Sequence, residues 1–263
     1  MKKNLIVLIC LAFVTLLVAK AMSFSGSYTP GGGINGTVHD LPRTDTGMSY
    51  TASPADSLNR ICIFCHAPHN TYRLSGTTGG AGPEADPAYD YLPLWNHTLE
   101  EAPSFTMYEN GLGAPQTGPK ASQAILNGMV PGSVSLLCLS CHDGNIAVNS
   151  WGNSNQRSQS TGTTVITPAY QIGMDNYLGN HHPIGFNYED VQSSDPEIRL
   201  SSTYITPTTT IADHLYGSET RMECATCHSV HNKGNAGETL LWRSDQNSEL
   251  CLTCHDKGVY TSP

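Results

Sequence analysis

The residues best suited to chemistry in this sequence are cysteines and histidines in a repeated pattern. Eight of the nine cysteines form four C-x-x-C pairs, and a histidine follows every pair directly. Two thiols at this spacing lie on one side of a helical turn, so both can join one haem while the next imidazole reaches its iron. The sequence therefore predicts four covalently bound haem c groups. The four motifs, first to fourth, are Cys62, Cys65 and His66; Cys138, Cys141 and His142; Cys224, Cys227 and His228; and Cys251, Cys254 and His255.

Two other roles of paired cysteines explain the pattern less well. Exported cysteines often form disulfides, and C-x-x-C pairs often bind structural zinc, but neither role needs the histidine that follows each pair. A zinc ribbon also places its two pairs about 15 to 20 residues apart. Consecutive pairs here are separated by 72, 82 and 23 residues.

Each haem iron has a second axial position, and seven further histidines can fill it. Because seven ligands exceed the four that are needed, every iron can be closed on both faces, which favours electron transfer over catalysis at an open iron. No enzymatic activity is predicted. The seven histidines are His39, His69, His97, His181, His182, His214 and His231.

An internal repeat narrows the choice among these ligands. CIFCHAPHN at residues 62–70 matches CATCHSVHN at residues 224–232, and LLCLSCHDG matches ELCLTCHDKG. The chain is therefore predicted to be a duplicated two-haem module. His69 and His231 lie three residues after a motif histidine and cannot reach the far face of the same haem, so each is predicted to ligate a neighbouring haem.

The two halves differ after a Leu-Trp pair that both contain, ending at Trp95 and at Trp242. The first half continues to His97, whereas the second continues with Arg243 and lacks this candidate ligand. His182 is the predicted substitute, because the proline that follows it restrains the adjacent backbone. The candidates for four irons are then His39, His69, His97, His182 and His231, with His181 and His214 left open.

The ordered set of motifs resembles a known family. The segments that carry the resemblance are TVHDLP, ICIFCHAPHN, LPLWNH, LCLSCHDG, HHPIGFNY, MECATCHSVHN and LCLTCHD. They resemble multihaem c-type cytochromes with doubled CxxCH motifs, in particular the OmcE-like tetrahaem proteins that polymerise into extracellular filaments. The resemblance implies stacked bis-histidine haems, a homopolymer with one intersubunit haem ligand, for which we favour His39, and redox partner proteins or an extracellular electron acceptor.

Composition predicts how the chain is organised. Residues 1–21 begin with lysines and continue as an apolar run that contains Cys10 and is too short to span a bilayer, which is typical of a secretory signal peptide. We expect a secreted protein, extracellular or at the cell surface, or periplasmic if it does not polymerise, with no membrane span in the mature chain. The predicted parts are a flexible N-terminal arm at 22–38, a first two-haem module at 39–149, a polar connector at 150–172 and a second two-haem module at 173–263.

The fold is predicted to rely on more than side chains for its interior. Only 38% of the 263 residues are hydrophobic, and 25 are glycine, which is little for a continuous core. We expect a multihaem cytochrome c that is mostly coil, with short helices and little β structure, built around four haems. Helices are predicted over 56–66, 133–142 and 248–255, and β structure over 163–167.

Charge excludes one class of partner. The formal net charge is −9, and binding to nucleic acid requires clustered basic residues. The leading prediction is an exported cytochrome that passes electrons along stacked bis-histidine haems as a filament subunit. Two alternatives stay open: a soluble periplasmic electron shuttle, and a multihaem reductase of nitrogen or sulfur oxyanions.

Overall fold

The computed structural model describes residues 32–42, 58, 60–71, 94–99, 104–108, 129–152, 159–166, 168–217, 220–233 and 240–256. Within these ranges the chain is mostly coil, with short helices and very short strands, as predicted. No helix in these ranges is both long enough and apolar enough to cross a bilayer. The predicted signal peptide and residues 22–31 of the predicted arm lie outside the described residues.

Helices carry the haem motifs, and two of the three predicted helices are confirmed. The prediction of 133–142 matches α3, and that of 248–255 matches α6 to within a residue at each end. Of the helix predicted over 56–66, the structure has one 3-10 turn, and residues 56, 57 and 59 are outside the described ranges. The α-helices are α3 (Ser133–His142), α4 (Tyr188–Ser194), α5 (Cys224–Cys227) and α6 (Glu249–Cys254), and the 3-10 helices are η1 (Ile61–Phe64), η4 (Pro168–Tyr170), η5 (Met174–Asn176), η6 (Ile211–His214) and η7 (Gln246–Ser248).

The strands form two small antiparallel pairs. β1 (Ser150–Trp151) pairs with β2 (Ser160–Thr161), and β3 (Phe186–Asn187) pairs with β4 (Arg221–Met222). The β structure predicted over 163–167 is wrong in position, because the strand lies at 160–161 and residues 163–166 are coil. There the Thr164 carbonyl accepts from the Val148 amide at 2.8 Å, and Oδ1 of Asn149 accepts from the Thr164 amide at 3.0 Å, so the contact between the two segments continues beyond β2 without forming a regular strand.

The apolar interior is divided into small clusters rather than one core. The larger two contain Trp95, Leu99, Leu136, Leu137, Leu139 and Leu178, and Tyr188, Val191, Ile198 and Ile211. Motif cysteines border these clusters: Cys65 packs against the first, and Cys254 packs against the second. Each cluster is therefore completed at a place where a haem is expected to be attached.

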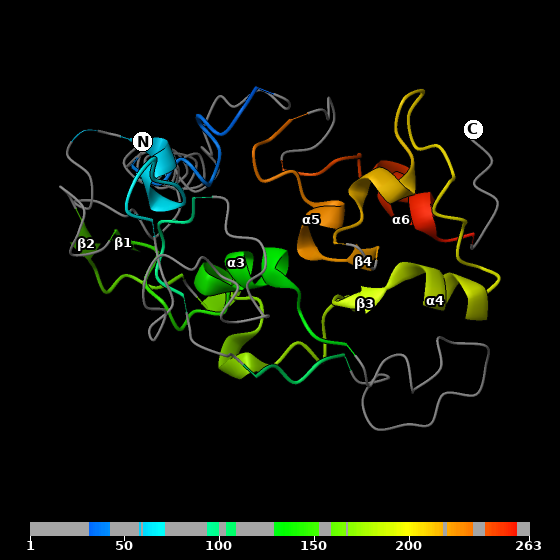
Figure 1. Cartoon of the computed structure of the whole chain (residues 1–263), viewed down its shortest axis with the longest axis horizontal. Helices are drawn as coiled ribbons and strands as arrows, with labels where there is room; N and C mark the ends of the chain where they lie inside the picture. The colour runs from blue at the N-terminus through cyan, green and yellow to red at the C-terminus, as the bar shows by residue number, and fades with distance from the viewer. Residues whose placement is uncertain are drawn as a thin grey trace, which may run out of the picture.

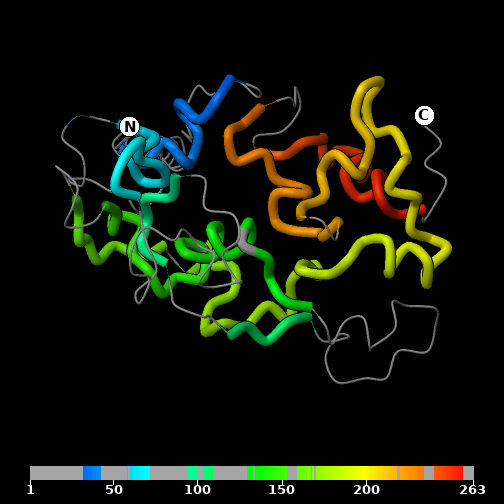
Figure 2. The backbone as a smooth tube through the Cα atoms, in the orientation of Figure 1, coloured from blue at the N-terminus to red at the C-terminus, as the bar shows by residue number. Residues whose placement is uncertain are grey.

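The four motif segments follow the long axis of the molecule in chain order. In Figure 1 the cyan turn of η1 lies at one side, α3 and α5 adjoin near the centre, and α6 lies at the other side. The blue segment 32–42 runs beside the orange loop that follows α5 (Figure 2). Asn232 of that loop donates a side-chain hydrogen bond to the Gly33 carbonyl at 3.0 Å. The segment before His39 thus lies against the second half of the chain.

Candidate haem-binding sites

Each C-x-x-C-H motif is held on a short helical turn that orients both thiols and the imidazole. The amide of His66 donates to the Cys62 carbonyl at 2.8 Å, and the amide of His255 donates to the Cys251 carbonyl at 3.0 Å. His228 makes the same bond to its first motif cysteine, and His142 is the last residue of α3. This turn brings the two cysteines to one side, as thioether attachment requires. None of the eight motif cysteines forms a disulfide.

A second segment runs antiparallel beside the first motif of each module. In the first module the Ala67 amide donates to the Leu94 carbonyl at 3.0 Å. In the second module the Ser229 amide donates to the Leu240 carbonyl at 2.9 Å. Leu94 and Leu240 also share a left-handed backbone, with φ of 53° and 61°. The two modules therefore use the same local architecture, and Leu94 corresponds to Leu240.

This correspondence shifts the repeat by one residue from the Leu-Trp match seen in the sequence. Asn96, not Trp95, corresponds to Trp242. Asn96 donates its side-chain amide to the Ile63 carbonyl at 2.5 Å, and Trp242 donates Nε1 to the Ala225 carbonyl at 2.9 Å. Ile63 and Ala225 occupy the same place in their motifs. The match of Trp95 with Trp242 was therefore wrong. The two modules share the positions of their hydrogen bonds at this place, not the residue types.

Three of the four motif histidines face a second histidine. The ring centroids of His66 and His231 lie 6.1 Å apart. Those of His142 and His39 lie 6.2 Å apart. Those of His255 and His182 lie 6.3 Å apart. The last pair joins the fourth motif to the histidine that the sequence predicted for the second half.

These separations fit an iron held between two imidazoles. A bond from a first-row metal to an imidazole nitrogen is about 2 Å long, and the ring centroid lies about 1 Å beyond that nitrogen. Two imidazoles on opposite faces of one haem therefore have centroids about 6 Å apart, as in the three pairs. The residues present fit the group, and a haem bound there supplies a one-electron redox couple at its iron.

Hydrogen bonds orient two of the candidate ligands. Nδ1 of His182 lies 2.9 Å from the Pro183 carbonyl oxygen, and Nδ1 of His228 lies 3.2 Å from the Leu240 carbonyl oxygen. Because a carbonyl can only accept, Nδ1 is the donor in each contact, which leaves Nε2 as the nitrogen that would meet iron. A metal-binding histidine is commonly held in this way.

Burial keeps other candidate ligands in the neutral form that binds metal. Burial, and next the charge of His142, lower the pKa of His39 to about 4. Burial also lowers the pKa of His142 and lowers that of His97 to about 4. The imidazoles are therefore deprotonated at neutral pH, as a lone pair for iron requires.

Burial acts on the thiols in the opposite direction. It raises the pKa of Cys65 and that of Cys227 to about 12 each. A hydrogen bond to the Cys224 thiol, together with burial, raises the pKa of Cys138 well above its usual value. Cys138 of the second motif therefore lies near Cys224 of the third.

The remaining predicted ligands are not paired in the same way. Among the described residues, no second imidazole lies at such a separation from His228, which is exposed. His69, which corresponds to His231 in the repeat, is also exposed. His97 is fully buried, with Nε2 only 3.1 Å from Sγ of Cys141.

Two histidines that the sequence left open are also described. The His214 ring packs edge-on against Trp242, with centroids 4.9 Å apart. His181 is half-buried. Neither ring is among those that face a motif histidine.

One polar group at these sites was not predicted from the sequence. Glu223 immediately precedes Cys224 and is 2% exposed. A single glutamate before a motif carries no chemical signal of its own in the sequence. Its contacts with α3 become visible only in the folded chain.

Comparison with known proteins supports the haem assignment. Residues 219–259, which contain the third and fourth motifs, match the family model of the doubled CXXCH motif. No curated protein matches the chain. The doubled motif indicates covalently bound haem c and supports a multihaem c-type cytochrome. The function it implies is haem-based electron transfer.

Proposed function

We propose that the chain is an exported tetrahaem cytochrome that passes electrons along stacked bis-histidine haems as the subunit of an extracellular filament. The observation that carries this proposal is the placement of three motif histidines about 6 Å from a second histidine. An iron closed on both faces has no site for a substrate and exchanges electrons through the haem edge. We therefore propose that the protein is an electron carrier and not an enzyme.

The histidine pairs also suggest how the haems are linked to one another. His231 follows the third motif but lies opposite His66 of the first. A distal ligand that comes from beside another haem holds the two haems close together. His39 would serve the second haem and His182 the fourth. Three of the four irons would thus be closed within a single chain.

The haem of the third motif is the candidate for an intersubunit ligand. His39, favoured from the sequence for that role, lies opposite His142 of its own chain, which supports a role within one copy. His228 is exposed and is the motif histidine without an opposed imidazole among the described residues. We propose that a neighbouring copy supplies its second ligand, so that assembly closes the last iron.

The test begins with the number of haems and the spin state of each iron. Secreted protein is analysed by intact mass and by the pyridine haemochrome assay, with four haems expected and an N-terminus after residue 21. Electron paramagnetic resonance is then recorded on dissociated single copies and on assembled material. Single copies should contain one high-spin iron, which becomes low-spin on assembly.

Substitution of His39 separates a ligand within the chain from an intersubunit ligand. In single copies, His39→Ala should show one more high-spin iron than the unsubstituted protein, whereas the control His214→Ala should not. If His39 served a neighbouring copy, His39→Ala and unsubstituted single copies would give the same spectrum. Single copies that are fully low-spin and never assemble would indicate the soluble shuttle, and turnover of nitrite or sulfite would indicate the reductase.

A further inference from the structure

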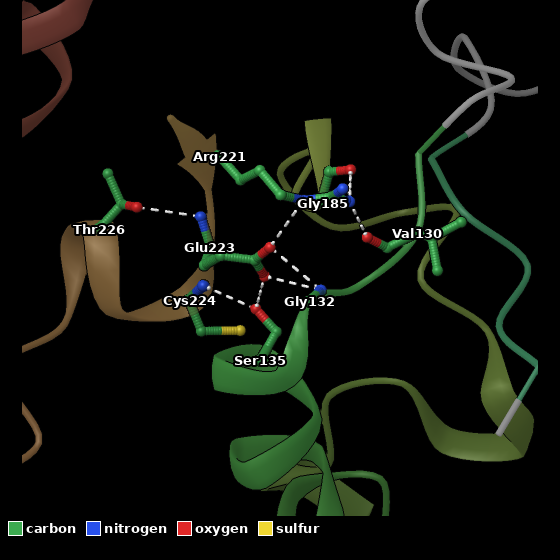
Figure 3. A network of polar contacts seen from close by, with 8 residues as sticks. All are labelled: Val130, Gly132, Ser135, Gly185, Arg221, Glu223, Cys224 and Thr226. Carbon is green, nitrogen blue, oxygen red and sulfur yellow. Dashed lines mark hydrogen bonds and ion pairs between the residues drawn. The ribbon is translucent and has the colours of Figure 1, made fainter. Parts of the chain in front are cut away.

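A buried carboxylate joins the two modules. Glu223 lies at the N-terminus of α5, and its side chain reaches the first turn of α3 (Figure 3). Both carboxylate oxygens accept from the Gly132 amide, at 3.0 and 3.2 Å. The Ser135 hydroxyl donates to Oε2. Glu223 thus connects residues that are about 90 positions apart in the sequence.

The site fits the ionised form of this carboxylate. Besides the Gly132 amide and the Ser135 hydroxyl, Nε of Arg221 lies 3.4 Å from Oε1. The Ser135 oxygen already accepts from the Cys224 amide at 3.0 Å, so its own proton points to Glu223. The pKa of Glu223 is raised overall, because burial outweighs the lowering by Ser135, Arg221 and Gly132. The amide and the hydroxyl donate to the carboxylate and the guanidinium forms an ion pair with it, which is an arrangement that stabilises a buried anion.

The surrounding backbone is shaped to hold this group. A Cβ at Gly132 would collide with Oε1 of Glu223, and a Cβ at Gly185 would collide with the Val130 carbonyl. Arg221 donates to the carbonyls of Val130 and Gly185, each at 2.5 Å. Gly132 therefore leaves room for the carboxylate, and Gly185 lets the chain approach Val130, where the two carbonyls hold the guanidinium (Figure 3).

The carboxylate lies between two haem attachment points. Glu223 adjoins Cys224 in the chain, and its partner Ser135 is one turn before Cys138 on α3. Cys224 itself donates its amide to the Ser135 hydroxyl oxygen at 3.0 Å. The second and third haems are thus attached on either side of one buried negative charge.

The two charges of the ion pair are not equally exposed. The Arg221 side chain is 27% exposed and the Glu223 side chain is 2% exposed. Water screens the exposed cation more than the buried anion. The electric field at the contact between α3 and α5 is therefore dominated by the Glu223 carboxylate.

We propose that Glu223 sets the reduction potentials of the haems at the second and third motifs. A fixed negative charge favours ferric over ferrous iron because the ferric haem carries one more positive charge. The carboxylate therefore lowers both potentials, and it does so at the step where electrons pass from one module to the other. This inference rests on the proposed function, since it requires a haem at each of these motifs.

The test compares variants that change charge in opposite directions. Glu223→Gln retains the size of the side chain and removes the negative charge, and Arg221→Gln removes the positive one. Potentials are measured by spectroelectrochemical titration and assigned to haems from the NMR signals of the haem methyl groups. Glu223→Gln should raise the second and third potentials and leave the first and fourth unchanged, whereas Arg221→Gln should lower the same two. Glu189→Gln, at an exposed site on α4, is the control for loss of one negative charge.

The outcomes separate a charge effect from a structural one. The proposal would be overturned if Glu223→Gln and Arg221→Gln shifted the reduction potentials in the same direction. It would also be overturned if the potentials of all four haems shifted equally. If Glu223→Gln does not retain its haems, the decision rests on Arg221→Gln, for which a rise or no change in the two potentials overturns it. Fewer than four haems in the unsubstituted protein would instead contradict the proposed function.

Discussion

The two modules share the geometry of their motifs but differ in how deeply they bury them. In the first module, Leu136, Leu137 and Leu139 of α3 are buried in the largest apolar cluster. In the second, α6 is six residues long and buries none of its residues. The local pattern C-x-x-C-H therefore sets the thiols and the imidazole in both, while burial depends on what packs against each helix.

A second difference arises at one equivalent position. His97 and Arg243 follow Asn96 and Trp242, which occupy the same place in the two modules. His97 lies 3.1 Å from Cys141 on α3, and Arg243 donates to Thr253 on α6 at 3.0 Å. Both side chains reach the last turn of the second motif helix in their module. The first module thus offers an imidazole where the second offers a cation, yet both second motifs face a histidine from elsewhere in the chain, His39 for His142 and His182 for His255.

The largest expected effect is loss of a haem from one module or the other. Replacing Cys138 and Cys141 by Ser removes the attachment on the buried α3, so we expect secreted protein to fall at least tenfold. The matched change of Cys251 and Cys254 affects the less buried α6 and should leave a secreted chain with one haem fewer. Haem per chain from intact mass, and yield by immunoblot, measure both. Equal losses would show that burial of the motif helix does not matter.

The next effect concerns the packing of the first motif. Trp151 is 2% exposed, and its ring packs edge-on against Phe64 with centroids 6.0 Å apart. Trp151→Ala removes a large buried side chain and should lower the free energy of unfolding by about 3 to 5 kcal/mol. The measurement is a denaturant titration of the haem-loaded protein. Tyr204→Ala, at a site 71% exposed, should change it little.

The shared hydrogen bond offers a direct comparison of the modules. Asn96 is fully buried, so Asn96→Ala leaves the Ile63 carbonyl without its donor and should cost about 1 to 3 kcal/mol. Trp242 is only half-buried, and Trp242→Phe, which removes the bond to Ala225, should cost about 1 kcal/mol. Thermal unfolding followed at the haem absorbance would compare them. A larger loss of stability for Trp242→Phe than for Asn96→Ala would contradict either the equivalence of Asn96 and Trp242 or the lower burial of Trp242.

The smallest effect belongs to an exposed ion pair of the second module. Arg199 lies 2.8 Å from Asp256, and both side chains are exposed. Asp256→Asn should reduce stability by less than about 1 kcal/mol, because water screens the pair, and Arg199 keeps its bond to the Leu252 carbonyl. The difference from the unsubstituted protein should shrink further in high salt. A loss comparable with that of Trp151→Ala would be inconsistent with a solvated pair.

The sequence alone determined the parts that depend on neighbours a few residues away. The spacing of Cys62, Cys65 and His66 is a local property of one turn, and so is the helix over 133–142 with Gly144 in the left-handed conformation after it. The two-residue strand at 160–161 was misplaced, because Thr164 bonds both to the Val148 backbone and to the Asn149 side chain and forms no regular ladder. Local backbone geometry is encoded within a few residues, and for this reason it could be predicted.

Only the tertiary structure decided which distant groups meet. The sequence assigned His182 to the second half and His231 to a neighbouring haem, but the motif histidine that each of them faces is set by how loops fold across the molecule. The one-residue shift of the repeat appeared only when backbone bonds were compared. The contact of Glu223 with Ser135 likewise depends on α3 and α5 packing together. Long-range contacts follow from the burial of whole elements, and that burial is a property of the complete fold.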